Sequence, residues 1–154
     1  MKNYTSEVPV NVTVGRIEAK LAAAGIQNIM KDYVTGEVAG LYFSLPDPRL
    51  AGAVIPVRLP ADVAAVFKVL RAGYDEKRKW PREREIRLMA QARRTAWKLM
   101  QDWVEVQLSL IELGQAEQLQ VFLPYVWLGT QTYYAKIKGG GFRALPAHDS
   151  KDPD

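Results

Sequence analysis

The sequence predicts an α+β fold: a small antiparallel sheet of about three strands packs against N-terminal helices and one long amphipathic helix, followed by a short helical C-terminal part. Three observations indicate this class. Residues 29–59 contain short apolar runs separated by turn residues, as strands do. Residues 82–113 lack glycine and proline and place apolar residues at helical spacing. The chain has 154 residues, 48% of them hydrophobic, so it can bury the core of a single domain.

The first expected element is a helix near the N-terminus. Asn11 or Thr13 can accept hydrogen bonds from the free amides of its first turn. Ile17 and Leu21 lie one turn apart and form its apolar face. Gly25 ends it, because glycine readily adopts the left-handed conformation that closes many helices.

Three strands should follow this helix. Residues 29–34 and 38–45 predict an antiparallel hairpin, with a turn at Thr35-Gly36. Residues 54–59 predict a third strand. Pro56 lies within it and lacks an amide hydrogen, so we expect this strand at an edge of the sheet or at a bulge.

The second half is expected to be mainly helical. Pro60 opens a helix that Gly73 closes, and Pro81 starts a long helix that runs to Gly114. A helix of this length spans about 50 Å, whereas a domain of this size is only about 40 Å across. The helix must therefore break, project, or pack on a second chain. Its apolar stripe is poorest before residue 94, so residues 81–94 are expected to project or to lie over a groove. Trp97 and Trp103 lie on or near the apolar stripe, so we expect them in the core.

The C-terminal part should be short and irregular. A helix after Gly114 is broken at Pro124 and followed by a buried apolar segment. Thr130 can cap a last helix that ends at the glycines of residues 139–141. We expect residues 1–146 to form one domain and residues 147–154 to be a disordered polar tail.

The basic residues concentrate in one part of the chain. The net charge is +4, but residues 68–98 contain eleven Lys or Arg and four Asp or Glu. The cations around Pro81 stand at a helix N-terminus, where the macrodipole favours anions. A phosphate would gain from both the cations and the dipole. The pattern therefore indicates a polyanion-binding surface, and a solvated face that keeps the protein soluble is the alternative.

The predicted interface consists of cations with one aromatic residue among them. The cations expected to neutralise phosphates are Lys77, Arg78, Lys79, Arg82, Arg84, Arg87, Arg94 and Lys98. Trp80 can either stack on a base or fasten the helix start to the core. Arg93 falls among the apolar positions and needs a partner. An ion pair with an acid of the hairpin or of the C-terminal half is the favoured interpretation, and a phosphate contact from the interior is the alternative.

The sequence lacks the residues that several common catalytic and metal-binding sites require. The chain has no cysteine, and its single histidine is His148, so neither a histidine-based triad nor a two-histidine metal site can be built. Asp102 and Glu105 lie one turn apart and could hold Mg²⁺, but Lys98 is the natural partner of Asp102. We therefore expect no enzymatic activity, no cofactor and no metal. No apolar run is long enough to span a bilayer and no secretory signal is evident, so we expect a cytoplasmic protein.

Four stretches between residues 4 and 125 follow one another in this order: YTSEVPVNVTVGRIEAKLAAAGI, PVRLP, RRTAWKLMQDWVEVQLSLIELGQ and VFLPY. Through these stretches the chain resembles a family of uncharacterised phage and prophage proteins. The family has no established activity and implies no catalytic residues. Its members look like products of phage early or recombination-type regions, and the resemblance therefore implies a role with single-stranded DNA or nucleoprotein.

These observations predict a non-enzymatic nucleic-acid-binding protein of phage origin in the cytoplasm of a host cell. The expected ligand is single-stranded DNA or a replication or recombination intermediate, bound through the basic helix start with little sequence specificity. Two alternatives remain open. The basic surface could dock on an acidic patch of a host or phage protein, so that the chain modulates a host enzyme. The long helix could instead pair with a second copy in a self-assembling homo-oligomer.

Overall fold

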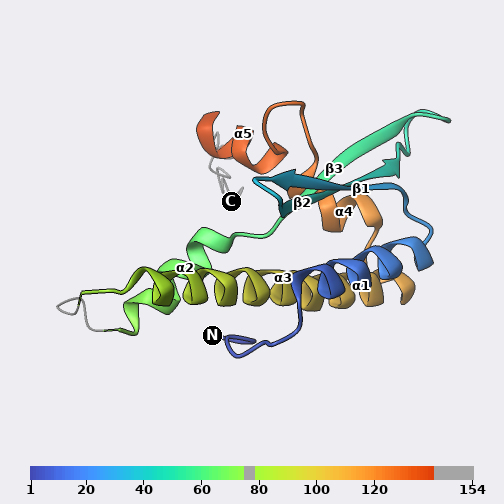
Figure 1. The fold of residues 1–154 in the computed structure, drawn as a ribbon. Helices are drawn as coiled ribbons and strands as arrows, with labels where there is room; N and C mark the ends of the chain where they lie inside the picture. Colours follow the sequence, from blue (N-terminus) through green and yellow to red (C-terminus); the bar gives the residue numbers. More distant parts are fainter. Residues whose placement is uncertain (75–78, 141–154) are drawn as a thin grey trace, which may run out of the picture.

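A computed structural model describes residues 1–74 and 79–140 of the chain (Figure 1). Its elements are helix α1 (Val10–Ala23), strands β1 (Gln27–Val34), β2 (Glu37–Pro46) and β3 (Val54–Pro60), helices α2 (Val63–Ala72), α3 (Arg82–Glu112) and α4 (Gln118–Phe122), the 3₁₀ turn η1 (Leu123–Tyr125) and helix α5 (Tyr133–Gly140). The predicted α+β class is confirmed. Lys77, Arg78, His148 and the expected tail lie outside the described residues.

The three strands form one antiparallel sheet in the order β1-β2-β3. The tight turn between β1 and β2 is the predicted one: Thr35 and Gly36 have φ values of 51° and 81°, which both central residues of a type I′ turn require. Strand β3 lies at an edge, as Pro56 predicted. The carbonyl oxygen of Pro56 accepts a hydrogen bond of 2.8 Å from the amide of Trp127, so the chain after η1 covers part of this edge.

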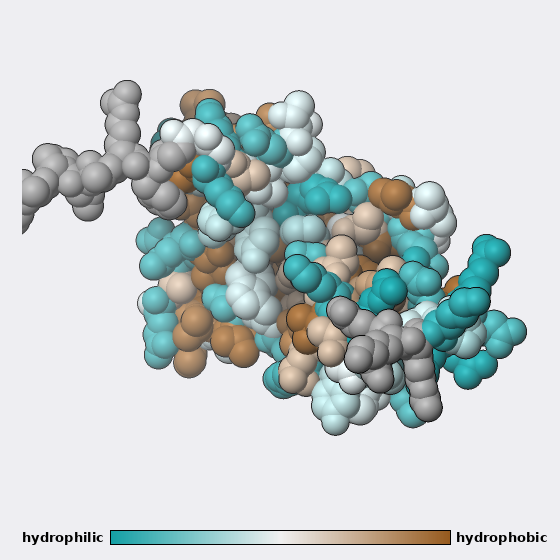
Figure 2. All heavy atoms as spheres, turned by 90° about the vertical axis from the view of Figure 1, so that its left-hand side faces the viewer, coloured by the Kyte–Doolittle hydropathy of each residue, from teal (hydrophilic) through white to brown (hydrophobic). Residues whose placement is uncertain are grey.

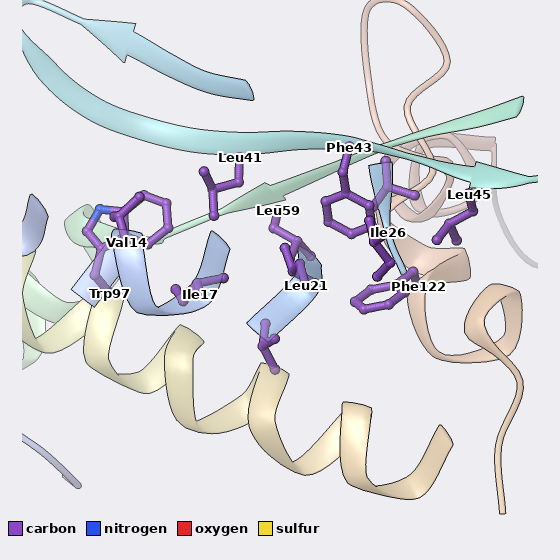
Figure 3. Packing of buried hydrophobic residues seen from close by; sticks show 12 residues of the cluster. Val14, Ile17, Leu21, Ile26, Leu41, Phe43, Leu45, Leu59, Trp97 and Phe122 are labelled. Carbon is purple, nitrogen blue, oxygen red and sulfur yellow. The ribbon is translucent and has the colours of Figure 1, made fainter. Parts of the chain in front are cut away.

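The core lies between one face of the sheet and the helices α1 and α3 (Figure 3). Strand β2 contributes Leu41, Phe43 and Leu45, which alternate along the strand and point the same way. Trp97 of α3 is fully buried, as expected, and its indole nitrogen donates to the carbonyl oxygen of Val38 at 3.3 Å. Phe122 of α4 packs edge-on against Phe43, with ring centroids 5.1 Å apart.

The end of α1 shows why the chain turns into the sheet there. Gly25 has a φ of 82°, and its amide donates to the carbonyl oxygen of Ala22 at 3.0 Å. The amide of the buried residue Ile26 donates to the carbonyl oxygen of Leu21 at 3.1 Å. This pair of hydrogen bonds is the Schellman arrangement, so the predicted glycine stop is confirmed.

The start of α1 differs from the prediction. The helix begins at Val10, and its cap is Pro9, whose carbonyl oxygen accepts from the amides of Val12 and Thr13. Asn11 and Thr13 therefore lie inside the helix and do not cap it. Thr13 is fully buried, and its hydroxyl has no hydrogen-bond partner in the described part of the chain. The expected cap was wrong because burial of this face placed Thr13 against the core.

The starts of the other short helices also differ from the prediction. Pro60 ends β3 rather than opening α2, whose cap is Asp62: its carboxylate accepts from the amide of Ala65 at 2.9 Å. The hydroxyl of Thr132, not that of Thr130, accepts from the first turn of α5. In both helices the cap is a residue two positions after the predicted one, and its side-chain oxygen accepts from a free backbone amide. The sequence pattern alone does not distinguish between cap positions that lie so close together.

The segment after Pro124 is less buried than expected. Val126 and Trp127 are half-buried, and Leu128 is exposed. Pro124 lies in η1, so the predicted break of the helix is confirmed. Helix α5 includes Gly139 and Gly140 instead of ending before them.

Helix α3 is unbroken over 31 residues, and one end of it projects. Helix α2 packs on its first half, where Val66 contacts Ala92 and Ala96 in a small second core. The first turns of α3, residues 82–87, are exposed throughout. In Figure 1 these turns extend beyond the sheet together with the end of α2. We call residues 67–74 and 79–88 the projecting end. The predicted projection is confirmed for residues 82–87, whereas residues 88–94, which were also expected to project, are half-buried or buried.

Candidate nucleic-acid interface

The projecting end carries a cluster of two aromatic rings and two guanidinium groups. The rings of Tyr74 and Trp80 meet edge to face, with centroids 5.2 Å apart and planes at 86°. The guanidinium of Arg84 lies 5.1 Å from the Tyr74 ring centroid and 5.3 Å from that of Trp80. Arg71, from the last turn of α2, lies 5.6 Å from the Trp80 ring. These cation–π contacts connect α2 to the start of α3 while keeping both positive charges near the surface.

A groove of about 470 Å³ opens beside this cluster. It is lined by Phe67, Lys68, Arg71, Ala72, Tyr74 and Trp80. Its lining therefore combines apolar and aromatic side chains with two cationic ones. Figure 2 looks onto this end of the molecule, where hydrophilic and hydrophobic residues lie next to one another.

Further cations surround the groove. Lys79 and Arg82 are exposed, and neither forms an ion pair with an acid of residues 1–74 and 79–140. Arg87 lies 3.8 Å from Glu83, but both side chains are more than 80% exposed, so water weakens this pair. Glu83 and Glu85 lie in the first turn of α3, where the helix dipole favours them. They offset part of the positive charge, and the projecting end keeps an excess of cations.

Three predicted contact residues are held by other parts of the chain. Arg93 forms the expected ion pair with the hairpin, at 3.8 Å from Glu37 of β2. Arg94 donates from Nε to the carbonyl oxygen of Ser6 at 3.0 Å and from a terminal guanidinium nitrogen to the side-chain oxygen of Gln91 at 2.5 Å. Lys98 is the third of these residues. All three lie on α3 after the projecting end.

Lys98 belongs to a polar cluster around Asp102. Its ammonium lies 3.2 Å from the carboxylate of Asp102, which also binds Lys2 at 2.7 Å and the amide of Asn3 at 2.9 Å. Burial raises the pKa of Asp102, but the hydrogen bonds from Lys2, Asn3 and Lys98 outweigh it and lower this pKa to about 2. The cluster fastens the N-terminal segment along α3.

Asp102 and Glu105 are thus both engaged in hydrogen bonds. Glu105 accepts from the buried side chain of Gln101 at 2.9 Å. Within residues 1–74 and 79–140, no group of three or more His, Asp or Glu side chains is placed to hold a metal ion. No helix in the same part of the chain combines the length and the apolarity that crossing a bilayer requires.

The structure adds residues that the sequence pattern did not single out. Phe67, Lys68, Arg71 and Tyr74 join the projecting end because the last turns of α2 lie beside the first turns of α3. The sequence does place the basic residues Lys68 and Arg71 near the end of the predicted second helix. They could not be assigned to the interface from the sequence, because the sequence does not show that the ends of α2 and α3 lie side by side.

No protein-family model, curated protein or solved structure matches the chain. The resemblance to phage and prophage proteins therefore stays a prediction. The candidate interface rests on the geometry of the projecting end.

Proposed function

We propose that the protein is a non-enzymatic nucleic-acid-binding protein of phage origin and that its ligand is single-stranded DNA. The observation that carries this proposal is the projecting end itself. Exposed cations from two helices surround an open aromatic groove there, away from the core. Arginine and lysine neutralise phosphates, and exposed aromatic rings suit unstacked bases, which a single strand offers and a duplex hides.

The proposed contacts are fewer than the sequence pattern predicted. Lys79, Arg82, Arg84 and Arg87 contact phosphates, whereas Arg94 and Lys98 hold the N-terminal segment in place. Four phosphate contacts give a slope of about −3 when the logarithm of affinity is plotted against that of salt concentration for a single strand. Affinity then falls about fiftyfold between roughly 50 and 200 mM salt. Because the contacts reach the backbone, binding has little sequence preference.

The test is a fluorescence-anisotropy titration of a labelled single-stranded oligonucleotide at several salt concentrations. The double variant Arg82→Glu, Arg87→Glu should bind far more weakly and halve the salt slope. Its matched control is Arg16→Glu, Lys20→Glu, which makes the same change in net charge on the exposed face of α1, distant from the projecting end (Figure 1). Equal loss in both variants, or no salt-sensitive binding by the parent protein, would refute the proposal.

A second candidate function, self-assembly, is favoured by a different surface. Val106 of α3 and Leu113, which directly follows α3, lie seven residues apart and are 58% and 70% exposed. Leu110 lies between them on the same stripe, at the spacing of a helix-pairing seam. Sedimentation of the parent protein and of Val106→Gln, Leu113→Gln decides this candidate. A monomer at all concentrations rules it out, and a dimer that the substitutions dissociate supports it.

A further inference from the structure

We propose that the groove between α2 and Trp80 holds one unpaired nucleobase, separately from the phosphate contacts on α3. This inference rests on the proposed function and specifies what part of the nucleic acid the groove recognises. The sequence pattern offered Trp80 alone as a stacking residue. The structure adds a concave site with walls from two elements, the last turns of α2 and the segment before α3.

The size and lining of the groove suit a flat heterocycle. Its volume of about 470 Å³ lies in the range typical of small-molecule pockets, about 300 to 1,000 Å³. Phe67, Tyr74 and Trp80 supply aromatic surface, and Ala72 leaves open the space that a larger side chain would fill. Aromatic surface of this kind binds any base through its π-face, so the site does not need a particular sequence.

The charges around the groove suit the backbone on either side of that base. Arg71 and Lys68 line the groove itself, and Arg84 lies over the rings of Tyr74 and Trp80. The two aromatic rings meet edge to face, so the edge of one ring covers part of the face of the other, and the guanidinium groups of Arg71 and Arg84 also lie over the Trp80 ring. A base placed on this surface would have a guanidinium within reach of its neighbouring phosphates.

The groove favours an unpaired base over a paired one. In a duplex, both faces of a base are stacked on its neighbours, and a protein must extract the base at a cost before binding it. Single-stranded nucleic acid presents its bases without this cost.

The experiment compares two polymers of equal charge. Anisotropy titrations use a labelled oligothymidine of about 15 nucleotides and an abasic phosphodiester of the same length. The parent protein should bind the oligothymidine about tenfold more tightly or better, with equal salt slopes for the two polymers. Equal affinity for both polymers overturns the inference but leaves the proposed function standing. Failure to bind either polymer overturns both.

Three variants test whether the groove causes the difference in affinity between oligothymidine and the abasic polymer. Trp80→Leu should reduce binding of oligothymidine to the abasic level, and Trp80→Phe should retain the preference because a π-face remains. Ala72→Phe fills the groove without removing an aromatic wall or a charge, so it should also abolish the preference. Thermal melting separates these effects from unfolding. If Ala72→Phe melts like the parent protein and keeps the full preference for bases, the groove is not the base site.

Discussion

Asp102→Asn is the perturbation whose cost the structure defines best. The carboxylate accepts hydrogen bonds from Lys2, Asn3 and Lys98, and its side chain is only 22% exposed. Its pKa is about 2, against an ordinary value of 3.8. One pKa unit corresponds to about 1.4 kcal/mol, so the ionised form contributes about 2 kcal/mol to the free energy of unfolding.

The sign of the pH dependence follows from the lowered pKa. A carboxyl group whose pKa is lower in the folded state stabilises the fold above its unfolded pKa, here near 4. This stabilisation is lost as the pH falls through the folded value of about 2. The asparagine variant has no charge to lose. Parent and variant should therefore differ by about 2 kcal/mol at neutral pH and converge as the pH approaches 2.

Urea unfolding followed by circular dichroism, at pH values from about 7 down to 2, measures this difference. Glu112→Gln is the control, because Glu112 is exposed at the end of the same helix. It should change the free energy of unfolding little at any pH. A difference between Asp102→Asn and the parent that stays constant with pH would show that lost shape, not lost charge, destabilises the variant. A difference near zero at pH 7 would refute the role of the cluster.

Three further predictions concern stability and the assignment of contacts. Lys98→Gln should weaken the fold yet leave the salt slope for single-stranded DNA unchanged, because Lys98 binds Asp102; a lower slope in titrations would contradict this. Trp97→Ala should cost about 3–5 kcal/mol in urea unfolding, since it empties a fully buried site and removes the donor to Val38; a cost below about 1 kcal/mol would contradict the packing. Gly36→Ala should cost about 1–2 kcal/mol, because its φ of 81° strains a residue with a Cβ even though no atom obstructs it; an unchanged melting curve would contradict the turn assignment.

Helix ends, turns and core positions that depend only on residues close in sequence could be predicted from the sequence. Gly25 ends α1 and Gly36 closes the hairpin because both need a positive φ, which glycine adopts at little cost. Pro56 marks an edge strand because it has no amide hydrogen to donate. Trp97 lies in the core because the apolar spacing of the long helix placed it there. Each of these follows from backbone conformation or helical period, which are local properties.

The contacts of the N-terminal segment could not be predicted from local sequence patterns. Residues 1–6 have no regular period, yet the carbonyl oxygen of Ser6 accepts from Arg94, and Lys2 pairs with Asp102. These contacts join positions roughly ninety to one hundred residues apart, and no spacing rule connects such positions. They decide that Arg94 holds the fold together instead of facing a ligand, whereas the pair of Lys98 with Asp102 follows the i,i+4 spacing of the helix.

The sequence by itself determined that cations gather at the start of a long helix and that this helix is longer than the diameter of its domain. Only the tertiary structure decided which of those cations stay free. Arg93 meets Glu37 because the hairpin folds over α3, and Arg71 meets Trp80 because α2 lies alongside it. A charge that a partner within the fold holds away from water is less available to a ligand, and packing of the core brings such partners close even when they are distant in sequence.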